Sequence, residues 1–310
     1  MSSKSKFKGK IRDNPLMALE RGRREVMLSL WQEYLDELLD LAPTSGRRRL
    51  LIDRIESDSN FQALYQDWDN LPPDQRAVRW LQVVQTAKNI VTATQNECLR
   101  CGDCCERSSP TLMAEDLALL QDEILHWTDI VTLRVGERAY DARRQQVITL
   151  TEERLKLREE PRSHRCLFFV TQPNRCLIYD HRPQQCRQQL CNRPPEEQPP
   201  ASGTPLTRQT IFGAHPEIWQ LITAHEERCA LSRLTATLEN LQNPAAQEDL
   251  FEVLHFDHYF RQYLRQEWQL PSRALDFLLG RPLPDLLPQF GLTAKLTPAG
   301  TYTLEPANQT

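Results

Sequence analysis

The stretch 98–105 constrains this chain more than any other, because it places four cysteines within eight residues in the order C-L-R-C-G-D-C-C. Cysteine in a protein core is usually scarce and inert, so packing does not explain such clustering. Thiolate ligands around a metal do explain it, because they must converge on one point from a short loop. Gly102, directly after Cys101, lets the backbone amides turn toward the sulfur atoms.

Four further cysteines follow after a gap, and a ninth, Cys229, stands apart. Eight thiols in two groups of four suit two four-thiolate sites or one large cluster, so we expect the two groups to lie close in space. The candidate metal ligands are therefore Cys98, Cys101, Cys104, Cys105, Cys166, Cys176, Cys186 and Cys191.

The spacing of Cys98, Cys101 and Cys104 matches the first three ligands of the C-x2-C-x2-C pattern of ferredoxins. Adjacent side chains seldom reach one small ion without strain, so Cys105 is expected to contact a different metal or to bridge. Zinc also accepts four thiolates, and spacing alone does not separate the two metals. The compact loop favours an iron–sulfur cluster, with zinc as the alternative cofactor.

Two further segments carry a family resemblance. Around 109–117 the chain reads S-x-T-L-x-x-E-D-L, and Cys176 opens the run C-L-I-Y-D-H-R-P-Q-Q-C that ends at Cys186. With the cysteine loop, they make residues 96–192 resemble the CxxCxxCC cysteine-cluster family of zinc- or iron-chelating domains, which is often labelled as containing an iron–sulfur cluster. Some members resemble flagellin lysine methylases, where the cluster would assist methyl transfer.

Bulk properties indicate an ordinary soluble protein. The chain has 310 residues, enough for about two domains, and its net charge of -4 gives no overall reason to bind nucleic acid or an acidic membrane. No run of 18 apolar residues predicts a membrane span, and the polar, lysine-rich residues 1–10 do not resemble a secretory signal. We therefore expect a cytoplasmic protein, in which clustered cysteines indicate metal or redox chemistry rather than disulfides.

Apolar periodicity predicts a mainly helical α+β fold around a small, β-containing, cysteine-rich core. Helices are expected over 16–41, over 47–68 with a break around 57–60, and from 72 to about 91, with Val78, Leu81, Val84 and Val91 buried. Further helices are expected near 115–125, over 216–241 and 247–268, and over 272–279.

Strands are expected over 130–135 and 146–150, near 301–304, and as a hairpin between Cys166 and Cys176. A helix opening near Pro183 would then carry Cys186. The predicted parts are a disordered basic tail (1–14), a helical lead-in (15–95), the metal-binding domain (96–192), a proline-rich linker or loop (193–208) and a helical C-terminal segment (209–310).

Other candidate sites are weaker. The cations His164, Arg165, Arg175, His181, Arg182 and Arg187 flank the second cysteine group and would lower thiol pKa values, although for each single residue a solvated basic loop is the favoured explanation. His225 and Cys229 share one apolar helix face, which favours a core cysteine beside a hydrogen-bonded histidine, so Cys229 should be dispensable for metal content. His255 and His258, with Asp257 between them, have ligand-like spacing without a third placed donor.

The sequence thus predicts a metal-binding protein in electron transfer, sensing or metal handling, with a redox or protein partner that it does not identify. One alternative is a structural zinc domain whose surface binds a partner. The second is a cluster-dependent methylase-like enzyme, for which no methyl-donor motif is recognisable. We see no serine-nucleophile, phosphate-binding or dinucleotide-binding motif, and the catalytic residues are unknown.

Overall fold

The computed structural model describes residues 15–95, 97–141, 144, 146–161, 163–191, 197–199 and 201–307. Two compact units divide the chain, one of Met1–Asp103 with Leu190–Asn192 and the other of Cys104–Gln189 with Arg193–Thr310. The fold is 54% helical, with small antiparallel two-stranded sheets, which confirms the mainly helical α+β class. The predicted basic tail lies outside the described residues, as do residue 96 and residues 192–196. The five-part division stays a prediction.

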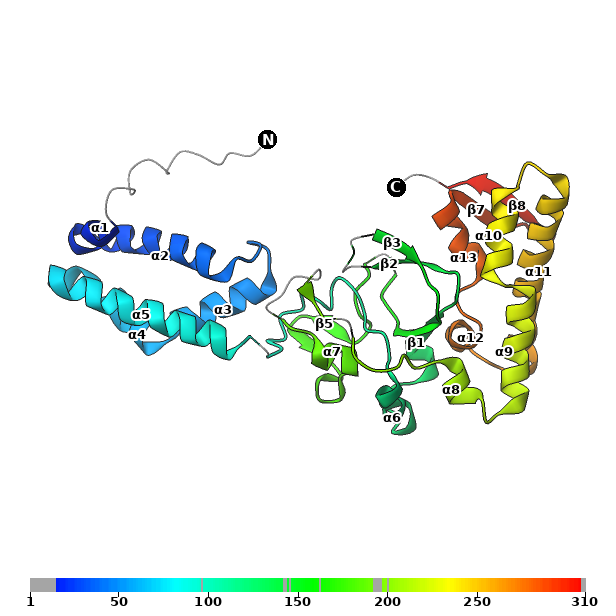
Figure 1. Cartoon of the computed structure of the whole chain (residues 1–310), viewed down its shortest axis with the longest axis horizontal. Coiled ribbons are helices and arrows are strands. Elements are labelled where there is room, and N and C mark those ends of the chain that lie inside the picture. The colour runs from blue at the N-terminus through cyan, green and yellow to red at the C-terminus, as the bar shows by residue number, and fades with distance from the viewer. Residues whose placement is uncertain are drawn as a thin grey trace. The chain divides into compact units, whose positions relative to one another are not determined.

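The first unit is helical (Figure 1). Its helices are α1 (Pro15–Arg21), α2 (Arg24–Leu39), α3 (Gly46–Glu56), α4 (Ser59–Asp67) and α5 (Pro73–Ala93), with a 3-10 turn at Trp68–Asn70. The predicted break near 57–60 is present, because the side chain of Asp58 caps the N-terminus of α4 by accepting from the Asn60 N–H at 2.9 Å.

Tryptophans organise the core of this unit. Trp31 and Trp68 are fully buried, and the Trp31 indole N–H donates to Glu56 at 3.1 Å. The prediction for α5 was partly wrong, because Val78 and Leu81 are exposed while Val83 is buried instead. Several apolar side chains on this helix compete for the inner face, and periodicity alone did not identify which of them face the core.

The second unit begins with short elements. They are the 3-10 turn Ala114–Asp116, α6 (Leu117–Gln121), the 3-10 turn Trp127–Asp129, β1 (Ile130–Leu133), β2 (Arg138–Asp141), β3 (Gln146–Thr149), β4 (Arg154–Leu157), β5 (Phe169–Thr171), β6 (Asn174–Cys176), the 3-10 turn Tyr179–His181 and α7 (Gln184–Gln188). The hairpin between Cys166 and Cys176 is confirmed as β5 and β6, with Phe169 opposite Cys176.

Strand pairing was only partly foreseen. The predicted strands β1 and β3 both form, but β1 pairs with β4 and β2 pairs with β3. The runs Arg138–Asp141 and Arg154–Leu157 are rich in charged residues and gave little strand signal. Leu155 and Leu157 are nevertheless buried and pack in the core of this unit, so tertiary burial outweighs the weak local preference.

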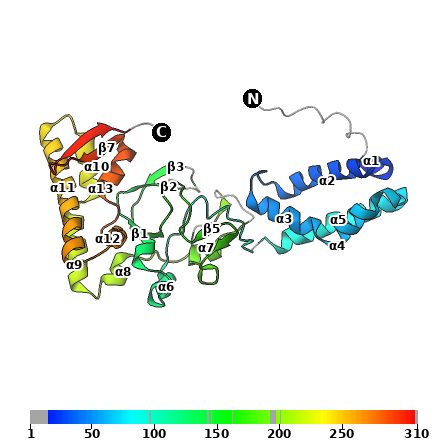
Figure 2. The same cartoon turned by 180° about the vertical axis from the view of Figure 1, so that it is seen from behind.

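Helices make up most of the remaining chain. They are α8 (Arg208–Phe212), α9 (Pro216–Arg228), α10 (Leu231–Glu239), α11 (Pro244–Glu267), α12 (Ser272–Leu278) and α13 (Leu283–Leu286), followed by the 3-10 turn Leu287–Phe290 and the hairpin β7 (Leu292–Leu296) and β8 (Tyr302–Pro306). The single helix predicted over 216–241 is two helices, broken at Cys229. Figure 2 shows α9 and α11 side by side, and they are in contact.

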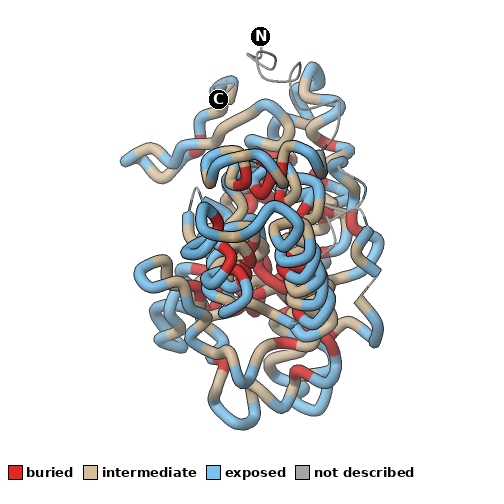
Figure 3. The backbone as a smooth tube through the Cα atoms, turned by 90° about the vertical axis from the view of Figure 1, so that its left-hand side faces the viewer, coloured by how far each residue is buried: buried red, intermediate tan, exposed pale blue. Residues whose placement is uncertain are grey.

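Residues from the beginning and the end of the second unit pack in one buried cluster. Figure 3 marks the buried residues along the backbone. In the second unit, Phe277 of α12 packs with Ile130 and Leu155 in one cluster. The end of the predicted linker also packs, because Leu206 is fully buried and its N–H donates to Leu112 O at 3.0 Å. Among the described residues, no helix is long and apolar enough to cross a membrane.

Candidate metal centre

Five of the eight predicted ligands lie in the second unit. Cys104 and Cys105 come from the cysteine loop, Cys166 precedes β5, Cys176 ends β6, and Cys186 lies in α7. All nine cysteines of the chain are thiols rather than disulfides, and Cys166 is buried. The fold therefore brings thiols from three separate segments into one unit.

Cys104 and Cys105 have their Sγ atoms 3.8 Å apart. Two thiolates that bind one tetrahedral metal through 2.3 Å bonds are separated by about 3.8 Å. The two sulfur atoms are thus close enough to share one ion. From the sequence, Cys105 is expected to contact a different metal or to bridge, because neighbouring side chains seldom converge. In the structure, a turn at residues 103–107 carries both cysteines.

Four of these five thiols affect one another's pKa values. In each of their pairs, at least one thiol raises the pKa of the other. The hydrogen bond with Cys104 raises the pKa of Cys105 most, followed by burial and by the nearby Cys186 and Cys166. Burial is the main cause that raises the pKa of Cys186, and Cys104 and Cys166 raise it further. Burial also raises the pKa of Cys166 to about 11, with a contribution from Cys104. We call Cys104, Cys105, Cys166 and Cys186 the thiol quartet.

The quartet has the donor chemistry of a metal site. Four thiolates in a small, partly buried space would repel one another, so without a cation the thiols keep their protons. A cation compensates these charges, and binding it releases protons. Cys176 also interacts with this group, since it raises the pKa of Cys166 and of Cys186.

Backbone hydrogen bonds hold the three segments in register. The N–H of Cys166 donates to the carbonyl of Cys105 at 2.8 Å, which ties the cysteine loop to the start of the β5–β6 hairpin. The Phe169 N–H then donates to Cys166 O at 3.0 Å and closes a turn around this cysteine. On the third segment, Cys186 N–H donates to Pro183 O at 3.0 Å in the first turn of α7.

Asp116 positions α7. Its carboxylate is buried and accepts from the backbone N–H of Gln184 at 2.8 Å and from that of Met113 at 2.9 Å. The side chain of Gln185 accepts from the Thr111 N–H in the same region. Asp116, Gln184 and Gln185 belong to the family motifs of the sequence, but no role was predicted for them. A buried acidic residue in the first turn of a short helical segment was the available signal.

The flanking cations have separate partners. Arg182 stacks over the Tyr179 ring at 4.0 Å and lowers the pKa of Cys186, against a larger effect of burial. Arg165 forms an ion pair with Glu160, and His164 lies 3.4 Å from Glu159. Arg182 thus lowers the pKa of one thiol, as the sequence predicts for a flanking cation.

The first unit holds Cys98, Cys101 and Cys191. The loop that carries Cys101 is attached to the N-terminus of α3, because Asp103 accepts from the backbone N–H groups of Gly46 at 2.7 Å and Arg47 at 3.2 Å. A side chain at Gly46 would have its Cβ 2.6 Å from the carbonyl oxygen of Cys101. The close approach therefore requires glycine at this position.

The predicted histidine pair does not gather ligands around Asp257. The ring of His255 lies 5.3 Å from Tyr302 and 6.2 Å from Tyr259, in aromatic contacts. Asp257 instead faces His225 and Arg261. On a helix, residues three and four apart share a face while neighbours do not, so the carboxylate lies away from both flanking histidines.

Residues 97–211 match the model of the CxxCxxCC family, described as a "Putative zinc- or iron-chelating domain". Over these residues, which are called the CxxCxxCC domain below, the chain is similar to this family. This match confirms the resemblance seen in the sequence, and it supports metal binding with zinc or iron as the cofactor. No curated protein and no solved structure matches the chain.

Proposed function

We propose that the CxxCxxCC domain binds a metal ion through the thiol quartet and that this ion stabilises the domain. The observation that carries the proposal is the mutual interaction of all four thiols, together with the 3.8 Å separation of the Cys104 and Cys105 sulfur atoms. That separation suits two ligands of one ion.

The elements around the quartet favour a stabilising role. The strands β5 and β6 have three residues each and α7 has five. An isolated two-stranded hairpin or a one-turn helix is not stable in water. A metal that joins the cysteine loop, the hairpin and α7 would cross-link them, because ligation couples metal binding to folding.

A four-thiolate site with one ion suits zinc or a single iron. Zinc supports a structural domain whose surface binds a partner, since it has no redox chemistry. A single iron bound by four thiolates would add one-electron transfer. With either zinc or iron, the proposed location of the protein is the cytoplasm, where thiols stay reduced.

An iron–sulfur cluster is the second candidate, with electron transfer, sensing or metal handling as its role. Its support is the ferredoxin-like spacing of Cys98, Cys101 and Cys104, together with Cys176 as a further thiol beside the quartet. Inorganic sulfide separates the two proposals, because a cluster contains it and a four-thiolate ion does not.

The test is metal and sulfide analysis of the full chain purified without oxygen, with visible absorption and electron paramagnetic resonance spectra. We expect zinc or iron without stoichiometric sulfide, and Cys105→Ala should lose one equivalent. Thr171→Ala is the control, because it changes a side chain of the same hairpin that is not a thiol, and it should retain that equivalent. Sulfide equimolar with iron, or equal losses in the two variants, would contradict a one-ion site on the quartet.

A further inference from the structure

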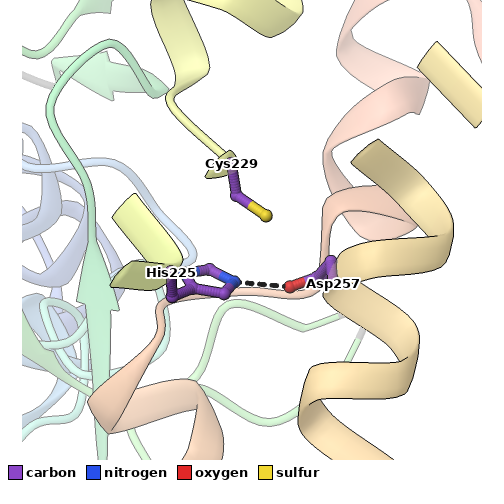
Figure 4. A group of neighbouring side chains, drawn as sticks. All are labelled: His225, Cys229 and Asp257. Atoms are coloured by element: carbon purple, nitrogen blue, oxygen red, sulfur yellow. Dashed lines mark hydrogen bonds and ion pairs between the residues drawn. The ribbon is translucent and has the colours of Figure 1, made fainter. Parts of the chain in front are cut away.

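A second group of metal-binding side chains lies outside the CxxCxxCC domain. Figure 4 shows His225 and Cys229 from the end of α9 beside Asp257 of α11. One ligand atom from each of the three lies within 4.8 Å of the others, and all three side chains are buried. His225 and Cys229 are one helical turn apart, so both project toward the same side of α9.

Asp257 is held in place by three donors. Its Oδ1 atom lies 2.8 Å from His225 Nε2 and accepts from Arg261 Nε at 2.8 Å, while Oδ2 accepts from the Leu283 N–H at 3.0 Å. Hydrogen bonds of this kind orient the carboxylates and imidazoles that bind metals. The contacts to Arg261 and Leu283 hold the carboxylate in place.

Two donors in the group have no protein partner. His225 Nδ1 is buried without a hydrogen bond, and the thiol of Cys229 has none among the described residues. The sequence predicts a core histidine whose hydrogen bonds are complete. In the structure, the Nε2 atom of His225 has a partner and its Nδ1 atom does not. A buried polar atom without a partner destabilises a fold, so such atoms commonly mark an unassigned ligand.

The donor set suits zinc. Zinc accepts thiolate, imidazole and carboxylate ligands in one site, whereas calcium and magnesium favour oxygen alone. A thiolate and a carboxylate together neutralise a divalent ion. The cations nearby are paired, since Arg134 lies 3.5 Å from Glu226 and Arg261 lies 3.6 Å from Asp276 in addition to its bond to Asp257.

We propose that His225, Cys229 and Asp257 bind one zinc ion that joins α9 to α11, independently of the thiol quartet. On binding, the Cys229 proton is released to solvent, and the imidazole keeps its single proton on the nitrogen that does not bind zinc. Because the group is fully buried, the ion enters during folding. This proposal departs from the expectation that Cys229 is dispensable, because the structure places Asp257 beside His225 and Cys229 as a third candidate ligand.

The test counts zinc in the full chain after expression in zinc-supplemented medium and dialysis. Cys229→Ala should carry one equivalent less than the parent, while Cys105→Ala reports separately on the quartet. His255→Gln is the control, because it replaces a histidine of α11 outside the group, and it should match the parent. Unchanged zinc in a folded Cys229→Ala variant would overturn the proposal.

A second variant covers the case in which Cys229→Ala fails to fold. In His225→Gln, the amide N–H can still donate to Asp257, so the helix contact survives while the imidazole ligand is lost. We expect the near-ultraviolet circular dichroism of the parent, one zinc equivalent less, and loss of one thiolate-to-cobalt charge-transfer contribution when cobalt replaces zinc. Parent-like zinc content and an unchanged cobalt spectrum would overturn the site.

Discussion

The carboxylate of Asp116 accepts a hydrogen bond of 2.8 Å from the backbone N–H of Gln184, across 68 residues of sequence. Gln184 is the first residue of α7, where backbone N–H groups have no partner within the helix. Asp116 therefore caps the short helix that carries Cys186, and it ties one family motif to the next. Burial raises the pKa of this carboxyl, and the N–H groups of Met113 and Gln184 oppose the shift.

We predict that Asp116→Ala lowers the free energy of unfolding of the second unit by about 1–3 kcal/mol, because it leaves two partly or fully buried N–H groups without an acceptor. The variant should also release its metal to a chelator faster, since α7 is less firmly held. Urea unfolding and a chelator competition measure the two effects. Glu115→Ala removes the exposed acidic neighbour and should change neither.

Metal removal should loosen the CxxCxxCC domain before the rest of the chain. The quartet joins segments of little regular structure, whereas α9 and α11 are long helices with their own buried residues. Hydrogen exchange on the loaded and the stripped protein should show lost protection over residues 104–189 and retained protection in α2 and α5, which lie outside both proposed metal sites. Full protection of residues 104–189 after stripping would show that metal does not stabilise this region.

Asp103→Ala should destabilise the first unit by about 0.5–2 kcal/mol, the usual effect of losing an N-terminal cap. The Asp103 side chain accepts from Gly46 and Arg47 N–H groups and from the Ser45 hydroxyl at 2.6 Å. Thermal unfolding followed by circular dichroism provides the measurement. Asp53→Ala, at an exposed position of the same helix, is the control, and an equal loss there would argue against a specific cap.

Glu56→Gln should stabilise the first unit at pH 7. Burial raises the pKa of Glu56 above its usual 4.5; the Trp31 hydrogen bond partly opposes this, and Asp53 adds to it. A carboxyl with a raised folded-state pKa destabilises the fold at higher pH, and this penalty vanishes as the pH falls below 4.5. Glutamine keeps an acceptor for the Trp31 N–H without the charge.

Urea unfolding at pH 7 and near pH 4 tests this sign. The stability gain of Glu56→Gln over the parent should be present at pH 7 and shrink toward zero at the lower pH. Glu33→Gln, at an exposed position of α2, is the charge-matched control and should show a smaller difference at pH 7. A gain that grows as the pH falls would contradict the assignment.

Local pattern in the sequence predicted much of the fold. The break between α3 and α4 follows from Asp58 as a cap, and the hairpin between Cys166 and Cys176 follows from two β-rich runs around a turn. These features depend on neighbours in the chain, so a short window of sequence contains their causes. The pairing of β1 with β4 was not predicted, because the charged residues of β4 weakened the strand signal of its buried leucines.

The sequence by itself determined that this chain has a cluster of thiols with the spacing of metal ligands, because residue type and spacing can be read along the chain. Only the tertiary structure decided which thiols meet in the quartet, that Asp116 supports it, and that His225 faces Asp257 across 32 residues rather than the nearby histidine pair. The physical reason is that such contacts depend on how separate helices and hairpins pack. Packing brings together residues that follow no common periodicity along the chain. Burial then requires their polar atoms to form hydrogen bonds with one another.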